Sequence, residues 1–424
     1  MKQDDIHLAV IGLGYVGLPL AATFGKKRQV LGFDVSAERV RELQHWVDVT
    51  QELTSDDLKA AQFLRFSSNK NELKLCNVFI IAVPTPLDEY NRPDLKPLLE
   101  ATEMVASVLK PKDLVIYEPT LYPGAIEDEC VPILEKISNL QYNTDFFVGY
   151  SPERSSPGNT ARRLENVCKI TSGSTPEAAN RVDWLYREII KVGTHQAPSI
   201  RVAEAAKVFE SIQSDVNIAL INELAILCNQ MGLDTQAVLQ AAATKWNFVY
   251  FRPGLAGGNY LTAAPYYLAH KAQQVGYQPD MMLAGRRLNT RMGNYVAQQC
   301  IKAMTRKSIP ITQARILIMG LTFKENCTDI RNTRVVDIVK ELQDFQCVVD
   351  VFDPLANKEE AYQTYGISLV SEPDRYVYDA IIITVAHRDF NVMGVDRIHS
   401  FGKKTHVLYD LRYLLPEYEV DLRL

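Results

Sequence analysis

The segment Leu8-Ala-Val-Ile-Gly-Leu-Gly-Tyr-Val-Gly17 decides the fold. An apolar run, His7–Ile11, ends in three glycines with the spacing Gly-x-Gly-x-x-Gly, and Leu18–Phe24 follows with the pattern of a helix. A strand, a glycine-rich turn and a helix in this order are typical of a dinucleotide-binding fold. In that fold Gly14 lets the backbone approach a pyrophosphate, and the helix N-terminus offers unpaired N–H groups and the positive end of its dipole.

A carboxylate follows the second predicted strand. Val30–Phe33 ends at Asp34, roughly twenty residues past the first glycine, where a dinucleotide-binding fold has the acid that holds the ribose. An acid rather than an arginine at this place favours NAD over NADP. We therefore predict NAD as the cofactor.

Three more apolar runs predict buried strands, and a polar loop with proline or glycine follows each of them. The carboxyl ends of parallel strands line the ligand crevice of an open sheet, so these loops are candidate walls of a site. The runs are Asn77–Val83, Leu114–Tyr117 and Asp145–Gly149, and the loops are Pro84–Pro86, Glu118–Gly124 and Ser151–Arg154.

The pattern changes in the middle of the chain. From about residue 200 to 304 it is helical without strand signals, and Ala203–Leu227 is too long and too apolar for a lone surface helix. Such a helix usually bridges domains or packs against a second subunit. A second strand-turn-helix unit begins at Arg315–Gly320 and continues through Val348–Asp353 and Ala380–Val385. Its first loop lacks the triple glycine, which favours a nucleotide other than a dinucleotide.

Length and composition limit the class of protein. The 424 residues predict two or three domains, and 47% hydrophobic and 23% charged residues are typical of a soluble globular protein. The net charge of −5 argues against nucleic acid as a partner. Without a long apolar run or a leader-like N-terminus, we expect no membrane segment and a cytoplasmic location. Seven cysteines without a Cys-x-x-Cys pair predict neither disulfides nor a zinc site.

Ordered segments along nearly the whole chain resemble the UDP-glucose/GDP-mannose dehydrogenase family. The resemblance is strongest to its bacterial UDP-N-acetylhexosamine 6-dehydrogenases, which serve polysaccharide pathways such as those of O-antigen and capsule. The matching segments are Gly12–Leu20, Val83–Pro86, Tyr122–Gly124, Ser151–Arg154, Ala203–Val208, Lys245–Phe248, Phe251–Leu255, Pro265–Leu268 and Gly320–Asn326.

The resemblance implies an α/β fold of two Rossmann-like domains with parallel sheets, joined by a long central helix and a helical middle domain. It places NAD on the first domain, the UDP-sugar on the last, and a homodimer contact in the middle. The boundaries that we expect are 1–198 for the NAD-binding domain, 199–304 for the helical dimerisation domain and 305–424 for the UDP-sugar-binding domain.

The motifs and the resemblance together suggest roles for residues, and Tyr260 is a candidate because it stands at the place of the family's nucleophile. The catalytic candidates are Tyr260, Lys207, Glu153 and Thr120. The cofactor-binding candidates are Gly12, Gly14, Tyr15, Val16, Gly17, Asp34, Arg39, Val83, Pro84, Thr85, Thr120 and Lys324. The substrate-binding candidates are Glu153, Arg154, Lys207, Ser211, Phe251, Arg252, Gly257, Asn259, Tyr260, Phe323, Lys324 and Arg331. No metal ligand is expected.

The chain departs from the family where the chemistry takes place. The family oxidises the C6 alcohol of its sugar twice, through a thiohemiacetal and a thioester on the cysteine of a Gly-Gly-His-Cys segment. That segment reads Gly257-Gly-Asn-Tyr260 here, so a tyrosine replaces the nucleophile. The family's aspartate falls on Ala264 and its asparagine on Ser211, and the segment Glu118-Pro119-Thr120 stands where a serine is expected beside the nicotinamide.

A phenol is a poor substitute for a thiolate as a carbon nucleophile, so covalent four-electron oxidation is disfavoured. We therefore predict a redox-neutral epimerase acting on a UDP-N-acetylhexosaminuronic acid. Transient oxidation at C4 would place C5–H beside a ketone, where Lys207 or Tyr260 is able to remove it, so C5 is favoured over C4. The alternatives are a 6-dehydrogenase that works without cysteine, through a hydrated aldehyde, and an inactive binding protein.

Other conspicuous side chains receive structural interpretations. We expect the histidines to be isolated surface or capping residues, Cys327 to be a small buried apolar residue, and Trp46 to lie in the core. The histidines concerned are His45, His195, His270 and His387.

Overall fold

The computed structural model describes residues 6–155 and 162–424, except for the side chains of Asn259 and Tyr260. Its contacts form two compact units. Unit 1 comprises Met1–Glu210 and Tyr266–Gln278, and unit 2 comprises Ser211–Pro265 and Pro279–Leu424. Helices α7 (Ile200–Met231) and α9 (Asn259–Gln274) contribute residues to both units. The boundaries of the three expected domains stay a prediction.

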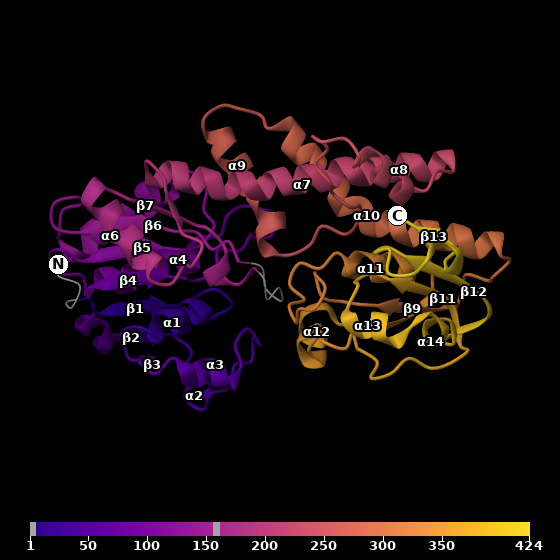
Figure 1. Ribbon diagram of the computed structural model, residues 1–424, viewed down its shortest axis with the longest axis horizontal. Helices are drawn as coiled ribbons and strands as arrows, with labels where there is room; N and C mark the ends of the chain where they lie inside the picture. The colour runs from indigo at the N-terminus through magenta and orange to yellow at the C-terminus, as the bar shows by residue number, and fades with distance from the viewer. Residues whose placement is uncertain (1–5, 156–161) are drawn as a thin grey trace. The chain divides into compact units, whose positions relative to one another are not determined.

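Unit 1 contains an eight-stranded sheet with the order β3-β2-β1-β4-β5-β6-β7-β8. Figure 1 shows most of these strands side by side in this order. All neighbouring strands are parallel except β6 and β7. The strands are β1 (Leu8–Ile11), β2 (Val30–Phe33), β3 (Leu64–Ser67), β4 (Val78–Ile81), β5 (Leu114–Tyr117), β6 (Phe147–Tyr150), β7 (Lys169–Gly173) and β8 (Thr194–Gln196). The helices are α1 (Gly17–Gly25), α2 (Ala37–Gln44), α3 (Ser55–Ala60), α4 (Lys96–Ala106), α5 (Val131–Ser138) and α6 (Pro176–Arg187).

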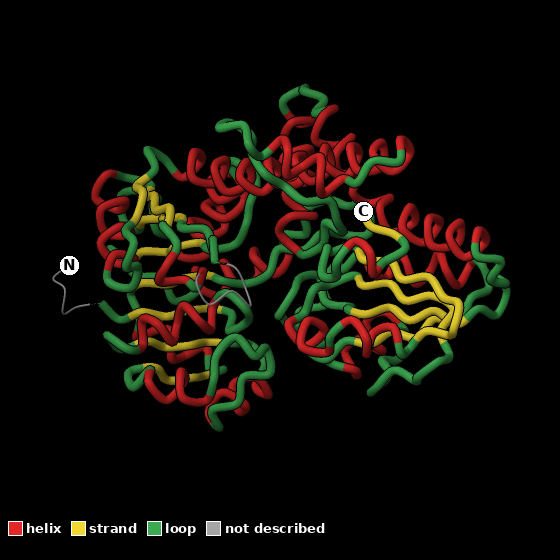
Figure 2. The backbone as a smooth tube through the Cα atoms, turned by 45° about the vertical axis from the view of Figure 1, so that its right-hand side comes forward, coloured by secondary structure: helices red, strands yellow, loops and turns green. Residues whose placement is uncertain are grey.

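Unit 2 contains a five-stranded parallel sheet with the order β10-β9-β11-β12-β13. Figure 2 shows the strands of this sheet in yellow. They are β9 (Arg315–Met319), β10 (Val348–Phe352), β11 (Tyr378–Ile383), β12 (Gly402–Asp410) and β13 (Leu422–Arg423). The helices of the unit are α8 (Thr235–Ala242), α10 (Asp280–Arg306), α11 (Val335–Asp344), α12 (Lys358–Tyr365), α13 (Arg388–Met393) and α14 (Val395–His399).

The central strands have the sequence that a parallel sheet requires. Strands β1, β4 and β5 are buried along their whole length, and their residues are almost entirely Leu, Val, Ile, Ala, Phe and Tyr. Helices cover both faces of a parallel sheet, so its strands are continuously apolar rather than alternating. The predicted α/β fold, with two Rossmann-like sheets and a long helix in the middle of the chain, is confirmed.

Each sheet has a point at which the strand order reverses, and a glycine follows the strand there. Gly12 after β1 and Gly320 after β9 have φ angles of 91° and 106°. A Cβ atom would lie 2.9 Å from the Ala82 carbonyl oxygen at the first position, and 2.6 Å from the Val385 Cβ at the second. Only glycine fits such a close approach with positive φ. Ligands of open α/β sheets bind beside these points.

Two expectations about single residues are wrong. Trp46 is not in the core, because its side chain is 38% exposed and its backbone has a φ of 63° in a turn after α2. His387 is not a surface residue, because it is fully buried. It is the N-cap residue of α13, but its side chain forms no cap and is hydrogen-bonded elsewhere within unit 2. Among the helices of residues 6–155 and 162–424, none combines the length and the apolar character needed to cross a bilayer.

Candidate functional site

The glycine-rich turn of unit 1 has the shape of a phosphate cradle. A Cβ at Gly17 would lie 1.8 Å from the Gly12 carbonyl oxygen, so this glycine is required for the packing of α1 against the turn. A Cβ at Gly14 would meet no protein atom within 4 Å. The N-cap residue of α1, Val16, forms no side-chain cap. An exposed glycine before an uncapped helix N-terminus fits an approaching pyrophosphate.

The carboxylate of Asp34 lies beside this turn. Its Oδ2 accepts a hydrogen bond from the Leu13 N–H at 2.9 Å, and its Oδ1 accepts one from the Ser36 N–H at 2.9 Å. A carboxylate accepts about four hydrogen bonds, so Asp34 retains capacity for ribose hydroxyls. Arg39 supports the turn instead of extending freely, because its Nε donates to the Leu13 carbonyl at 3.0 Å and its Nη2 to Asp48 at 2.7 Å.

The loops after β4 and β5 meet at the carboxyl edge of the same sheet. The Thr85 hydroxyl donates to the Thr120 carbonyl at 3.1 Å, and the Tyr267 hydroxyl donates to the Thr85 carbonyl. Thr120 is 3% exposed, and its own hydroxyl has no hydrogen-bond partner among the residues that the structure describes. A buried hydroxyl without a partner is costly, which points to a ligand atom at this place. The residues of unit 1 therefore fit a dinucleotide.

A buried ion pair that we did not predict holds two of these loops. Lys169 on β7 is 1% exposed, and its ammonium group donates to Glu118 Oε2 at 2.6 Å and to the Pro152 carbonyl at 2.8 Å. The Tyr186 hydroxyl also donates to Glu118. Burial raises the pKa of Glu118 to about 7, although the charge of Lys169 opposes this change. The pair connects the loop that bears Thr120 with the loop after β6.

The loop after β6 bears Glu153, which lies close to Lys169. Glu153 is almost fully buried and accepts hydrogen bonds from the Arg154 and Ser155 N–H groups. Burial opposes ionisation of Glu153, but the charge of Lys169 and the Ser155 N–H hold its pKa below the usual value. Glu153 is therefore ionised at neutral pH.

Helix α7 adds a buried cation to this cluster. Burial lowers the pKa of Lys207, against the opposing charges of Glu210 and Glu153. The Lys207 ammonium lies 3.4 Å from Glu210 Oε1, and Arg154 donates to the other oxygen of Glu210 at 3.1 Å. The structure thus brings the predicted residues Glu153, Arg154 and Lys207 together in unit 1. Their catalytic roles stay predictions.

In unit 2, buried polar side chains form hydrogen bonds to the backbone that leads to Gly257 and Gly258. Asn222 bonds to both the N–H and the carbonyl of Gly254, at 2.8 and 3.0 Å. Arg286 bonds to Asp215 at 2.7 Å and to the Ala256 carbonyl at 3.3 Å.

The two glycines themselves pack against Phe323. A Cβ at Gly258, where φ is 89°, would lie 2.9 Å from the Phe323 ring, and one at Gly257 would lie 3.3 Å from the Phe323 Cβ. The predicted residues Gly257 and Phe323 are therefore neighbours. Ser211 is half-buried and Ala264 is buried. The side chains of Asn259 and Tyr260 lie outside the described residues.

The cations of unit 2 differ in their surroundings. Arg331 forms a two-pronged pair with Asp329, at 2.9 and 2.6 Å. Arg252 is exposed beside the Tyr250 ring, Phe251 is half-buried, and Lys324 is half-buried on the loop after β9.

Arg412 is a further cation of unit 2 that we did not predict as a site residue, and it lies near enough to Arg252 for their charges to interact. Its half-buried guanidinium donates no hydrogen bond to any described residue. Burial lowers the pKa of Arg412, with Glu325 opposing and Arg252 adding to the effect. A guanidinium of this kind suits a phosphate or carboxylate group. Cys327 on the neighbouring loop is buried, and burial raises the pKa of its thiol to about 11, so it supplies no thiolate.

Three segments of the chain match the domains of one family. Residues 6–190 match the NAD binding domain of the UDP-glucose/GDP-mannose dehydrogenase family, residues 201–291 its central domain, and residues 317–417 its UDP binding domain. The chain is 58% identical over 422 residues to UDP-N-acetyl-D-glucosamine 6-dehydrogenase of Pseudomonas aeruginosa, and the alignment covers 100% of both chains.

Two further comparisons agree with these matches. The chain is 55% identical over 421 residues to UDP-N-acetyl-D-glucosamine 6-dehydrogenase of Salmonella typhi, over 99% of each chain. Its fold matches the solved structure of a UDP-D-ManNAc dehydrogenase from Pyrococcus horikoshii with a TM-score of 0.89 and 29% identity, over 99% of this chain and 98% of that one.

Proposed function

We propose that this chain, which belongs to the UDP-glucose/GDP-mannose dehydrogenase family, is an NAD-dependent dehydrogenase acting on C6 of a UDP-N-acetylhexosamine. The presence of the family's NAD-binding and UDP-binding domains supports this proposal. The main support is 58% identity over the full length to a 6-dehydrogenase. The relatives named above are dehydrogenases, so the comparisons favour this alternative over the epimerase that we predicted first from the sequence. With Tyr260 at the place of the family's cysteine, the proposed reaction proceeds without a thiol intermediate.

The residues of unit 1 supply what such a reaction requires of the protein. NAD, which the glycine-rich turn and Asp34 would hold, would supply the hydride acceptor for two successive two-electron oxidations, from alcohol to aldehyde and from aldehyde hydrate to carboxylate. The buried Thr120 hydroxyl is available to hydrogen-bond a reacting oxygen. Glu153, held ionised, is suited to orient and activate the water that forms the hydrate. Lys207, whose pKa is lowered by burial, is suited to take the alcohol proton.

We expect NADH to accumulate when the protein is mixed with NAD and UDP-N-acetylglucosamine, with two NADH formed for each carboxylate. Glu153→Gln should lower the rate by about 100-fold or more, because a general base contributes on this order. NADH absorbance and NMR of the sugar nucleotide check both expectations, and Glu165→Gln, at a partly exposed ion pair, is the control. Binding of both ligands without any NADH formation would contradict the proposal.

The epimerase remains a second candidate, because Tyr260 and Ala264 replace the family's cysteine and aspartate together. Its signature differs from that of a dehydrogenase. With a UDP-N-acetylhexosaminuronic acid in D2O it would place deuterium at C5 and form a new isomer without net NADH. Tyr260→Phe would then abolish deuterium exchange but not NAD binding. Unlabelled, unchanged sugar would exclude this candidate.

We also propose a homodimer that forms through the middle of the chain. On the part of α7 in unit 2, four large apolar side chains are exposed at the spacing i, i+4, i+7 and i+11, which places them on one face of the helix. Trp246, after α8, is 91% exposed. A contiguous apolar stripe of this kind is typical of an interface. The four residues are Leu220, Leu224, Leu227 and Met231.

Leu224→Asp is expected to shift the protein from dimer to monomer. A twofold contact loses this leucine from each subunit, which costs about 3–6 kcal/mol in all and weakens association by at least about 100-fold. Light scattering after size exclusion, over a range of concentrations, measures the change. Leu75→Asp, at a leucine of unit 1 that is more exposed than Leu224, is the control. A dimer of unchanged dissociation constant in the Leu224 variant would show that another surface is used.

A further inference from the structure

The two units use the same aspartate position in different ways. Asp34 and Asp353 each follow the second strand of their unit, and each accepts the N–H of the residue after the turn glycine. Two backbone N–H groups donate to Asp34, whereas Asp353 is buried and both of its oxygens are occupied. The donors to Asp353 are the N–H groups of Leu321 and Thr322 at 2.6 and 3.0 Å, and those of Leu355 and Ala356 at 2.8 and 3.0 Å.

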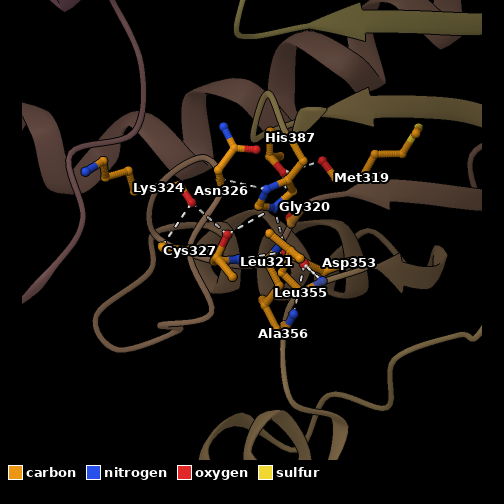
Figure 3. Close-up of polar contacts among 12 residues, drawn as sticks. Met319, Gly320, Leu321, Lys324, Asn326, Cys327, Asp353, Leu355, Ala356 and His387 are labelled. Carbon is orange, nitrogen blue, oxygen red and sulfur yellow. Dashed lines mark hydrogen bonds and ion pairs between the residues drawn. The ribbon is translucent and has the colours of Figure 1, made fainter. Parts of the chain in front are cut away.

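His387 adds a fifth contact to Asp353. It is the fourth residue after β11, the place that Thr85 occupies after β4 in unit 1. Its Nε2 lies 3.2 Å from Asp353 Oδ2 and 3.1 Å from the Thr322 hydroxyl, and its Nδ1 accepts the Asn326 N–H at 3.0 Å (Figure 3). Because Nδ1 accepts from a backbone N–H, the ring carries its proton on Nε2, from which it donates.

Together, Asp353 and His387 hold the loop after β9 at both ends. Asp353 binds the first two N–H groups of the loop, and His387 binds the N–H of Asn326, whose side chain in turn accepts the Arg388 N–H at 3.0 Å. Between these ends the Lys324 carbonyl accepts from Thr322 Oγ1 at 2.9 Å and from the Cys327 thiol at 3.2 Å. The Lys324 side chain extends away from this cluster in Figure 3.

We propose that His387 is a positioning residue for the binding of a nucleoside diphosphate by unit 2. By fixing the loop from Leu321 to Asn326, it sets the direction in which the Lys324 ammonium is presented to the phosphates. The five donors on Asp353 also leave this carboxylate no capacity for a ribose, so the ligand of unit 2 is bound by the loop rather than by the aspartate. The inference rests on the proposed binding of a UDP-sugar.

Titrations of the full-length protein with UDP, and separately with NAD, test this role. His387→Leu removes the three polar contacts of the ring and should weaken UDP binding by about ten-fold, since a hydrogen bond contributes on this order, without changing the NAD dissociation constant. His195→Leu, an exposed histidine of unit 1, is the matched control. His387→Asn keeps an acceptor near the Asn326 N–H and should recover part of the affinity.

The combination with Lys324→Ala separates positioning from a general structural effect. If His387 acts through Lys324, the double variant His387→Leu/Lys324→Ala binds UDP no more weakly than Lys324→Ala alone. An equal loss in both backgrounds, or unchanged UDP binding in His387→Leu, would overturn the inference. If His387→Leu does not fold, the same cycle with His387→Asn decides the question. A wild-type protein that binds NAD but not UDP would instead contradict the proposed function, and the inference with it.

Discussion

Replacing Lys169 by methionine is expected to lower the free energy of unfolding of unit 1 by about 3–5 kcal/mol, because it leaves the Glu118 carboxylate buried without its cation. Two loops lose their common support at the same time, since the Lys169 ammonium also holds the Pro152 carbonyl. We therefore expect the rate of NADH formation to fall as well.

The effect of Lys169→Met should depend on pH. Burial raises the pKa of Glu118 from its usual 4.5 to about 7, so the folded protein retains a proton that the unfolded chain loses between these values. The folded state then binds more protons, and this group's contribution to stability is present below pH 4.5 and is lost as the pH rises to about 7. Without Lys169 the pKa of Glu118 rises further, so the variant loses stability up to a higher pH.

Urea denaturation followed by tryptophan fluorescence measures this change. In a Trp246→Phe background the remaining tryptophans, Trp46 and Trp184, both lie in unit 1. Lys169→Met/Glu118→Gln should regain part of the loss, because the buried charge is removed while Tyr186 keeps an acceptor. Lys191→Ala breaks an exposed pair with Glu165 and should cost less than about 1 kcal/mol. If Lys169→Met lowered the free energy of unfolding by no more than Lys191→Ala does, the buried pair would not be important for stability.

Two alanine substitutions in the glycine-rich turn should have different consequences. Gly17→Ala would place a Cβ 1.8 Å from the Gly12 carbonyl oxygen, and the backbone has to move to relieve this clash. We therefore expect the free energy of unfolding to fall by more than about 4 kcal/mol, or unit 1 not to fold. Gly14→Ala meets no protein atom within 4 Å, so it should fold normally. Its methyl group would crowd a pyrophosphate and weaken NAD binding by about 10–100-fold.

Calorimetric titration of the Gly14 variant with NAD, and with UDP as the control ligand, checks this expectation. Thermal denaturation of both variants separates loss of fold from loss of binding. NAD binding by Gly14→Ala with the wild-type dissociation constant would show that the pyrophosphate lies away from the turn, and a normally folded Gly17→Ala would show that the turn tolerates a side chain.

Local patterns were sufficient to predict much of this fold. The glycine spacing, the buried apolar strands and the change to helical periodicity near residue 200 each depend on residues close together in the sequence, and they correspond to β1, α1 and α7. The loops after β4, β5 and β6 were predicted as site walls from the same logic, because strand ends of a parallel sheet meet at one edge.

Long-range pairing was not visible in the sequence. Lys169 and Glu118 are 51 residues apart and Asp353 and His387 are 34 apart, so neither pair shows a local pattern. A lone histidine looks like a surface residue until its partners are known, which explains the wrong interpretation of His387. Arg412 was missed for the same reason, because its environment is formed by Arg252 and Glu325 from distant segments.

The filled carboxylate of Asp353 has a consequence for selectivity between the ligands. The chain contains two Rossmann-like sheets, and the two nucleotides that they are proposed to bind, NAD and a UDP-sugar, both contain ribose and pyrophosphate. Since backbone amides fill both oxygens of Asp353 while Asp34 keeps spare lone pairs, we expect the second sheet to bind a dinucleotide more weakly than the first, because it offers no carboxylate oxygen to the ribose. This difference in affinity, together with the concentrations of the two nucleotides, then sets how often each one occupies the second sheet.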